Sequence, residues 1–168
     1  AIWVIQGWQD NPTSGTIRGV KKYPGHALIL DLSTNSDPKW SSNSEFGGTP
    51  WIYNTIEHLG GHKDMHGCLA TFAKLPSFIK ERNYAVGIGF VTEGTEVNPV
   101  TYELMMEACW EEKDIKLETW IRSYITRRYG ADSKSSYNAW NILLNTVYKT
   151  MDTWHVDTTN SAAFSTIW

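Results

Sequence analysis

The segment GIGFVTEGTEVNPVTYELMMEACW, residues 87–110, decides the fold that this chain is predicted to adopt. It begins inside an apolar, glycine-rich run of strand length, residues 85–91. After a polar turn, Asn98 suits the N-cap of a helix, because its side chain can accept a hydrogen bond from an unpaired backbone N–H. Pro99 suits the first helical position, where its missing N–H costs nothing. The segment therefore predicts a buried strand, an acidic turn and a helix.

The predicted helix has an apolar stripe at helical spacing, formed by Val97, Val100, Leu104, Met105, Ala108 and Cys109. In an α/β barrel, the turn between a strand and the following helix lies on the C-terminal face, where catalytic groups sit. Glu93 and Glu96 of this turn are therefore candidate catalytic residues. Acidic residues just before a helix also complement the positive end of its dipole, so spacing alone leaves both roles open.

The first 92 residues alternate between strands and helical segments. Parallel βα units are typical of such alternation, and four strands would make half of an eight-stranded barrel. A polar loop that is rich in Ser, Asn and Gly interrupts the pattern at residues 33–49. The predicted strands are residues 2–6, 26–32, 51–56 and 85–91, and the predicted helices are residues 16–23 and 65–73.

Helical patterns replace the alternation beyond Glu112. One apolar stripe comprises Leu117, Trp120, Ile121, Tyr124 and Ile125, and Gly130 follows it as a stop signal. A second comprises Tyr137, Trp140, Leu144, Val147, Tyr148 and Met151, with Ser133 or Ser135 as its cap. The short connection between the stripes predicts an antiparallel pair of packed helices.

Composition excludes some functions. With 15 Lys and Arg against 18 Asp and Glu, the chain has a net charge of −3, which argues against nucleic-acid and anionic-membrane partners. Its sequence contains no apolar run of transmembrane length. The two cysteines, Cys68 and Cys109, stand beside apolar residues, so buried free thiols are expected rather than a disulfide. The chain begins inside a strand pattern, so a leader sequence upstream could be missing.

Several polar and aromatic residues have two interpretations. Trp110, Trp120 and Trp140 fall on helical stripes and are expected in the core, whereas Trp8 follows a strand through Gly7 and should reach its end. Asp31 ends a predicted strand, where anchoring a loop through backbone N–H groups is favoured over contacting a substrate hydroxyl.

A metal hypothesis arises from Glu57, His58, His62, Asp64 and His66, because imidazole and carboxylate are ordinary zinc ligands. The Gly60-Gly61 pair disfavours a continuous helix between His58 and His62, and no metal site is predicted.

Several segments resemble the α-N-acetylglucosaminidases, a glycoside hydrolase family that includes the lysosomal enzyme degrading heparan sulfate. Residues 93–105 resemble the family's Glu-Gly-x-x-x-Asn-x-x-x-Tyr-x-Leu-Met segment, and residues 3–8 resemble its Trp-x-x-Gln-Gly-Trp strand. Further similarity lies, in order, at residues 28–32, 50–53, 60–61, 66–67, 127–130, 139–140 and 167–168.

The resemblance implies an α/β fold: residues 1–112 would form the C-terminal half, strands five to eight, of a TIM-type (β/α)8 barrel. Residues 113–168 would begin an all-α domain. It also implies a retaining exo-glycosidase that removes terminal α-linked N-acetylglucosamine, without metal or organic cofactor. By motif position Glu93 would be the nucleophile, and Trp8, Asn54 and His155 would bind the substrate. The acid/base residue would lie in a missing N-terminal half-barrel, the partner of this chain, so the chain alone would be inactive.

The sequence departs from the family at two positions. Many members carry Cys at the position of Asn54 and Asn at the position of His58, which leaves Glu93 untouched but puts details of pocket specificity in doubt. Two other functions stay open: a non-catalytic carbohydrate-binding module, and a metal-dependent hydrolase that uses His62 and His66. The sequence leaves the compartment undetermined: secreted or extracytoplasmic for a bacterial source, lysosomal for a eukaryotic one.

Overall fold

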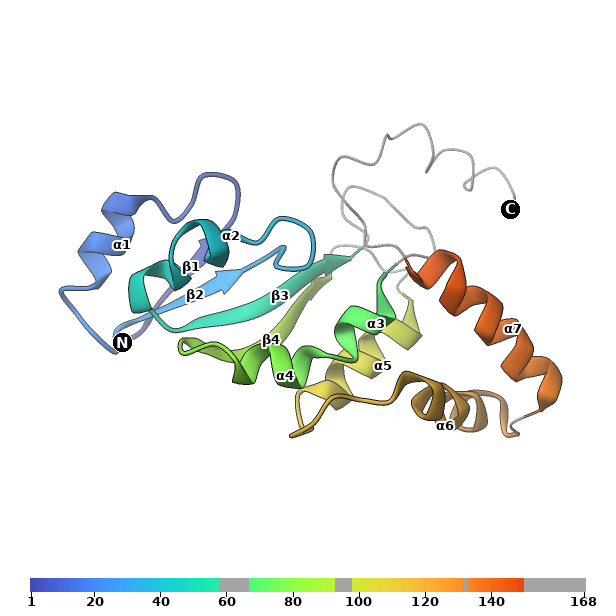
Figure 1. Cartoon of the computed structure of the whole chain (residues 1–168). Helices are drawn as coiled ribbons and strands as arrows, with labels where there is room; N and C mark the ends of the chain where they lie inside the picture. The colour runs from blue at the N-terminus through green and yellow to red at the C-terminus, as the bar shows by residue number, and fades with distance from the viewer. Residues whose placement is uncertain (58–66, 93–97, 132, 150–168) are drawn as a thin grey trace, which may run out of the picture. The chain divides into compact units, whose positions relative to one another are not determined.

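The computed structural model describes residues 1–57, 67–92, 98–131 and 133–149 (Figure 1). These residues form two compact units. One contains residues 1–57 and 79–92 and is built on a β-sheet, and the other contains residues 67–78 and 98–149 and is helical.

The sheet of the first unit has four parallel strands in the order β1-β2-β3-β4. The prediction of four parallel strands is therefore confirmed. No strand begins or ends more than one residue from its predicted position. The strands are β1 (Trp3–Gly7), β2 (Ala27–Asp31), β3 (Trp51–Glu57) and β4 (Ala85–Thr92).

The two faces of this sheet differ in burial. Ile29, Trp51 and Tyr53 share one face and are at most 2% exposed. Leu28 and Ile52, which alternate with them on the other face, are half-buried. A loop side chain covers the buried face, because Phe46 meets the Trp51 ring edge-on with ring centroids 6.1 Å apart.

The connection from β1 to β2 contains α1 (Ser14–Val20), which begins and ends two to three residues before the predicted positions. Thr13 explains the earlier start, because its hydroxyl accepts a hydrogen bond from the Thr16 backbone N–H at 3.1 Å. Ile17 and Val20 are the buried residues of this helix. The cap therefore fixes where the helix begins.

The predicted polar loop at residues 33–49 contains a short helix, α2 (Lys39–Ser42), and a turn, η1 (Glu45–Gly48). Backbone φ angles from Ser44 to Gly48 are all positive, between 48° and 89°. Side-chain contacts hold this left-handed turn in place: Phe46 is fully buried, and the Glu45 carboxylate accepts bonds from the Trp51 indole and the Tyr84 backbone N–H. Non-glycine residues adopt such angles only where surrounding contacts stabilise them.

Six further helical elements lie among the described residues, five of them wholly in the second unit. The predicted helix at residues 65–73 is wrong in extent: α3 covers only Leu69–Phe72, and α4 (Leu75–Lys80), which was not predicted, follows and extends into the first unit. The remaining elements are α5 (Pro99–Ala108), α6 (Leu117–Tyr129), α7 (Lys134–Asn145) and η3 (Val147–Lys149).

Helix α5 confirms the predicted start at Pro99 and the buried stripe of Val100, Leu104, Met105 and Ala108. The predicted capping bond is wrong, because the Asn98 side chain caps no helix N–H, although its backbone carbonyl accepts the Thr101 N–H at 3.1 Å. The prediction of burial is also wrong for two residues at the end of this segment. Cys109 is exposed and Trp110 is 86% exposed, because the helix ends at Ala108 and the next residues leave its packed face.

Helices α6 and α7 pack together through aromatic rings. Trp120, Tyr124, Trp140 and Tyr148 form a continuous run with ring centroids 5.1 to 6.0 Å apart. Burial raises the pKa values of Tyr124 and Tyr148. The predicted cap and stop are confirmed, because Ser133 caps α7 and Gly130 ends α6 with φ +82°. Both cysteines are free as predicted, with Cys68 half-buried.

Candidate functional site

The carboxyl ends of the four strands meet at one edge of the sheet, because the strands are parallel. Gly7 pairs with Asp31, and Asp31 pairs with Tyr53. Trp8 follows the last residue of β1, and Asn54 follows Tyr53 within β3, which continues to Glu57. Trp8 and Asn54 therefore lie at about the same level of the sheet, two strands and roughly 10 Å apart. The structure thus brings two of the predicted substrate-binding residues to the same level of the sheet, near the carboxyl ends of β1 and β2.

Trp8 begins a tight turn at this edge. Its backbone N–H donates to the Asn11 carbonyl at 3.1 Å, and the Asn11 N–H donates back to the Trp8 carbonyl at 2.9 Å. Glycine at the preceding position avoids a tight contact, because a Cβ on Gly7 would lie 3.0 Å from the Leu30 oxygen and 3.1 Å from the Asp31 Cα. The backbone of β1 thus approaches β2 closely just before Trp8, whose side chain is half-buried.

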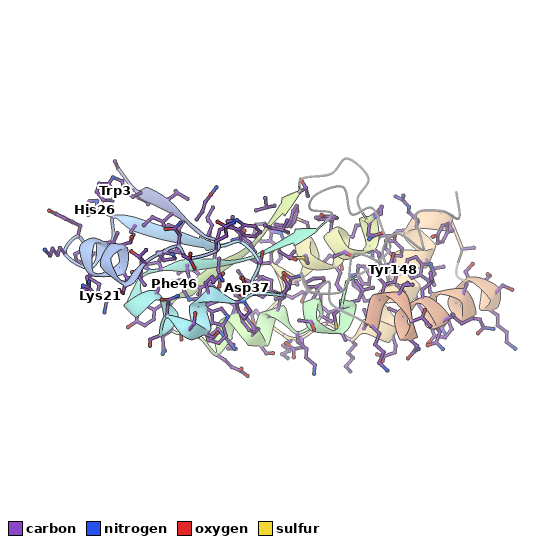
Figure 2. All side chains as sticks on the ribbon, turned by 90° about the horizontal axis from the view of Figure 1, so that it is seen from above. Trp3, Lys21, His26, Asp37, Phe46 and Tyr148 are labelled. Atoms are coloured by element: carbon purple, nitrogen blue, oxygen red, sulfur yellow. The ribbon has the colours of Figure 1, made fainter. Side chains whose placement is uncertain are left out.

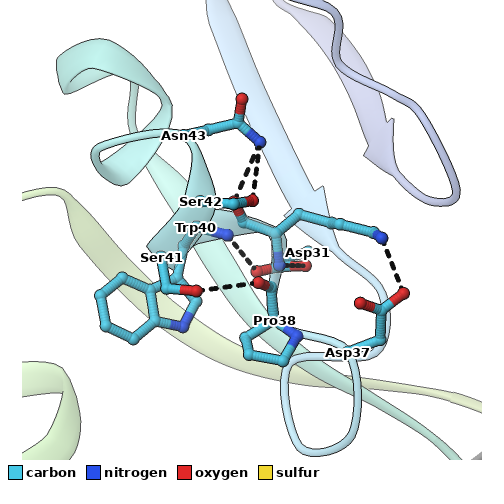
Figure 3. A network of polar contacts seen from close by, with 8 residues as sticks. Asp31, Asp37, Pro38, Trp40, Ser41, Ser42 and Asn43 are labelled. Atoms are coloured by element: carbon cyan, nitrogen blue, oxygen red, sulfur yellow. Dashed lines mark hydrogen bonds and ion pairs between the residues drawn. The ribbon is translucent and has the colours of Figure 1, made fainter.

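Asp31 anchors the loop that follows β2, as the sequence favoured (Figure 3). Its carboxylate oxygens accept hydrogen bonds from the backbone N–H groups of Lys39 at 3.2 Å and Trp40 at 3.0 Å. The side chain is fully buried, and this desolvation raises the pKa of Asp31 to about 6 against the opposing effect of the two backbone bonds. Lys39 is paired instead with Asp37 at 2.7 Å. Asp31 therefore positions the loop.

We predict that the Asp31→Asn substitution flattens the pH dependence of stability. With a pKa raised from 3.8 to about 6, Asp31 contributes stability below pH 3.8 and loses it as the pH rises through 6. The wild-type free energy of unfolding should therefore fall, relative to that of the variant, by up to about 3 kcal/mol between about pH 4 and pH 7. Urea unfolding of both proteins across this range measures the difference. A constant difference would show that Asp31 does not titrate there.

Asn54 lies in β3 and is only 5% exposed. Thr34, which the sequence did not single out, fixes its backbone: the Thr34 N–H donates to the Asn54 carbonyl at 2.9 Å, and the Asn54 N–H donates to the Thr34 hydroxyl at 3.2 Å. The Thr34 hydroxyl in turn donates to the Asp31 carbonyl at 2.7 Å. Thr34 thereby continues the pairing of β2 with β3 beyond the last residue of β2.

Two predicted site residues lie outside the described residues. These are Glu93, which directly follows Thr92 at the end of β4, and His155. The metal candidates His58, His62 and His66 also lie outside them. Within the described part of the chain, no three His, Cys, Asp or Glu side chains gather as metal ligands would. Among the described helices, none has both the length and the apolar character that crossing a bilayer takes.

A hollow of about 330 Å³ lies at the opposite end of the sheet, where β1 and β2 begin. It is lined by Ala1, Trp3, Val20, Tyr23, His26 and Ala27, and Figure 2 shows Trp3 and His26 together at this end. None of the predicted site residues lines it, so this hollow is separate from the candidate site.

Comparison with known proteins identifies the family. Residues 1–112 match the model described as the alpha-N-acetylglucosaminidase (NAGLU) tim-barrel domain, and residues 120–166 match the model of the C-terminal domain of the same family. The chain belongs to the α-N-acetylglucosaminidase family. The human α-N-acetylglucosaminidase is 33% identical over 158 residues, which cover 88% of this chain and 21% of the human protein.

Solved structures of glycoside hydrolases are also similar to this chain. A family 89 glycoside hydrolase from Clostridium perfringens matches with a TM-score of 0.83 and 36% identity, over 92% of this chain and 17% of that chain. A second structure from the same organism, with two glutamates replaced by glutamine and GlcNAc-α-1,4-galactose bound as its substrate, matches with a TM-score of 0.82 and 36% identity. That match covers 91% of this chain and 17% of the other. This chain thus spans about a fifth of the length of these relatives.

Proposed function

We propose that this chain is the C-terminal half-barrel and the start of the helical domain of a retaining exo-glycosidase that removes terminal α-linked N-acetylglucosamine. One observation carries the proposal: residues 1–112 match the family's TIM-barrel domain, and their fourth parallel strand ends at Thr92, directly before the Glu93-Gly94 pair. The described strands run in parallel, as a TIM barrel requires.

In this proposal Glu93 is the nucleophile. Its carboxylate attacks the anomeric carbon as the glycosidic bond breaks, and the leaving oxygen takes a proton from an acid/base carboxyl about 5–5.5 Å away. A water then hydrolyses the glycosyl ester, returning its proton to the same acid/base residue. Two glutamates replaced by glutamine in a substrate-bound relative support a mechanism with two carboxyl groups.

The acid/base group of this mechanism would belong to a half-barrel that precedes this chain. Residues 1–112 then supply strands five to eight of the barrel, and residues 113–168 begin the helical domain. Trp8 offers an apolar face to the sugar, and Asn54 and His155 offer polar contacts. No metal or organic cofactor takes part in the proposed steps.

Trp8→Ala in the complete enzyme should weaken substrate binding by roughly 1–3 kcal/mol, the scale of burying one large apolar face. The expected result is a raised KM. Trp110→Ala provides the matched control, because Trp110 is 86% exposed and lies in the other unit. Equal KM and kcat for the wild type and a stably folded Trp8→Ala variant would remove Trp8 from the sugar site.

Hydrolysis of a chromogenic N-acetyl-α-glucosaminide by the complete enzyme tests the function, with NMR to identify the first-formed anomer. We expect turnover of the α-linked substrate and initial release of the α-anomer. Initial release of the β-anomer would exclude retention. Sugar binding without turnover would favour a carbohydrate-binding module, and loss of turnover with a chelator would favour a metal-dependent hydrolase.

A further inference from the structure

Two glycines of β4 lie beside the side chains that β3 places on its half-buried face. Gly87 pairs with Ile52, and Gly89 pairs with Asn54. The register of β3 and β4 shifts between Trp51 and Ile52. From the Ile52–Gly87 pair onward the pairing is regular. Neighbouring residues in register share one face of a sheet, so Gly89 stands next to the Asn54 side chain.

The Asn54 carboxamide occupies the space that a side chain at position 89 would need. A Cβ built on Gly89 would lie 2.5 Å from Asn54 Oδ1, 3.6 Å from Asn54 Cγ and 3.5 Å from Ile52 Cγ2. The first distance is shorter than any ordinary contact between such atoms. At Gly87 the nearest atom to a built Cβ is Ile52 Cγ1, 4.0 Å away, which is ordinary van der Waals contact.

Hydrogen bonds hold Asn54 in the space beside Gly89, which we call the niche. Its side-chain Nδ2 donates to the Ile52 carbonyl at 3.0 Å. Its backbone N–H and carbonyl are both bound to Thr34, at 3.2 Å and 2.9 Å. With the backbone fixed, a methyl group at position 89 could be accommodated only by turning the carboxamide away from β4, which would break the Nδ2 bond.

We propose that Gly89 is a positioning residue for Asn54: by having no side chain it leaves the niche that fixes the direction of the Asn54 carboxamide toward the sugar. The proposal rests on the proposed function, in which Asn54 binds the substrate. An amide presents a donor and an acceptor at different atoms, so turning it exchanges the groups that meet a sugar hydroxyl or acetamido group. Gly89 therefore affects recognition of the substrate and not the transfer step.

Kinetics of Gly89→Ala and Gly87→Ala in the complete enzyme test this role. Both substitutions add one methyl group to the same face of the same strand. Gly89→Ala is expected to raise KM for the chromogenic N-acetyl-α-glucosaminide about tenfold, the scale of one misplaced hydrogen bond, with kcat changed less than about threefold. Gly87→Ala is expected to leave both within about twofold. Equal KM values for the two variants, or a loss in kcat alone, would overturn the proposal.

A double substitution distinguishes a clash with the Asn54 side chain from general destabilisation of the sheet. Asn54→Ala removes the clashing atoms, so Gly89→Ala should lower the melting temperature in the wild-type background and much less in the Asn54→Ala background. Its effect on KM should likewise vanish there. Additive effects on either quantity would contradict the proposal. A wild-type enzyme that neither binds nor hydrolyses the substrate would overturn the proposed function, whereas the melting temperatures would still test the niche.

Discussion

Replacing Glu93 with alanine in the complete enzyme is expected to lower kcat at least on the order of 10³-fold, about 4 kcal/mol of activation free energy. A retaining glycosidase needs an ionised nucleophile that is aimed at the anomeric carbon, and the end of a barrel strand is the platform for such groups. Glu93 follows Thr92, the last residue of β4, and precedes Gly94, whose missing side chain would allow close approach of a ligand.

Glu96 is the matched control, because it lies in the same acidic segment and carries the same group. Glu96→Ala should lower kcat less than about tenfold, since complementing a helix dipole is worth under about 1 kcal/mol. Added azide should partly restore turnover to the Glu93→Ala variant, with an inverted product, because a small anion can occupy the vacated space. An essential Glu96 and a dispensable Glu93 would reverse the assignment.

The 168-residue chain alone is expected to hydrolyse no N-acetyl-α-glucosaminide. In the described sheet, β1 and β4 are edge strands, and several of their apolar side chains are exposed: Trp3 at 65%, Val4 at 59% and Val86 at 60%. Apolar edges of this kind need a covering partner. In the proposed mechanism the acid/base residue belongs to a preceding half-barrel, so the chain alone would lack the proton source on which the leaving group depends.

Measuring turnover by the purified chain, by the complete enzyme and by a mixture of the chain with its preceding half tests this expectation. Activity should appear only when both halves are present. Turnover by the chain alone at a rate near that of the complete enzyme would contradict the half-barrel proposal.

The strands and the main helices could be predicted because their patterns repeat. An apolar run over residues 85–91 predicted β4, and Asn98-Pro99 marked the start of α5. The prediction for α5 was wrong at its end, because the apolar pattern continues to Trp110 whereas the helix ends at Ala108. Periodicity reports the spacing of apolar residues and carries no information on where packing partners end.

The loop between β2 and β3 could not be predicted in the same way. Its left-handed turn at residues 44–48 depends on the burial of Phe46. It also depends on hydrogen bonds that the Glu45 carboxylate accepts from the Trp51 indole and from the backbone N–H of Tyr84, which is distant in sequence. Thr34 and Gly89 were missed for the same reason, since their roles depend on contacts with Asn54. The spacing of Gly87 and Gly89 on one strand was the available signal.

The central claim is that Glu93 forms the covalent bond to the sugar, and trapping that intermediate tests it most directly. A fluorinated N-acetyl-α-glucosaminyl fluoride reacts slowly enough at the second step for the glycosyl ester to accumulate, and mass spectrometry locates it after trypsin digestion. Residues 83–113 form one tryptic peptide that contains both Glu93 and Glu96, so fragment ions must separate the two. We predict one sugar bound to Glu93. A sugar bound to Glu96, or to a peptide elsewhere in the enzyme, would contradict the account.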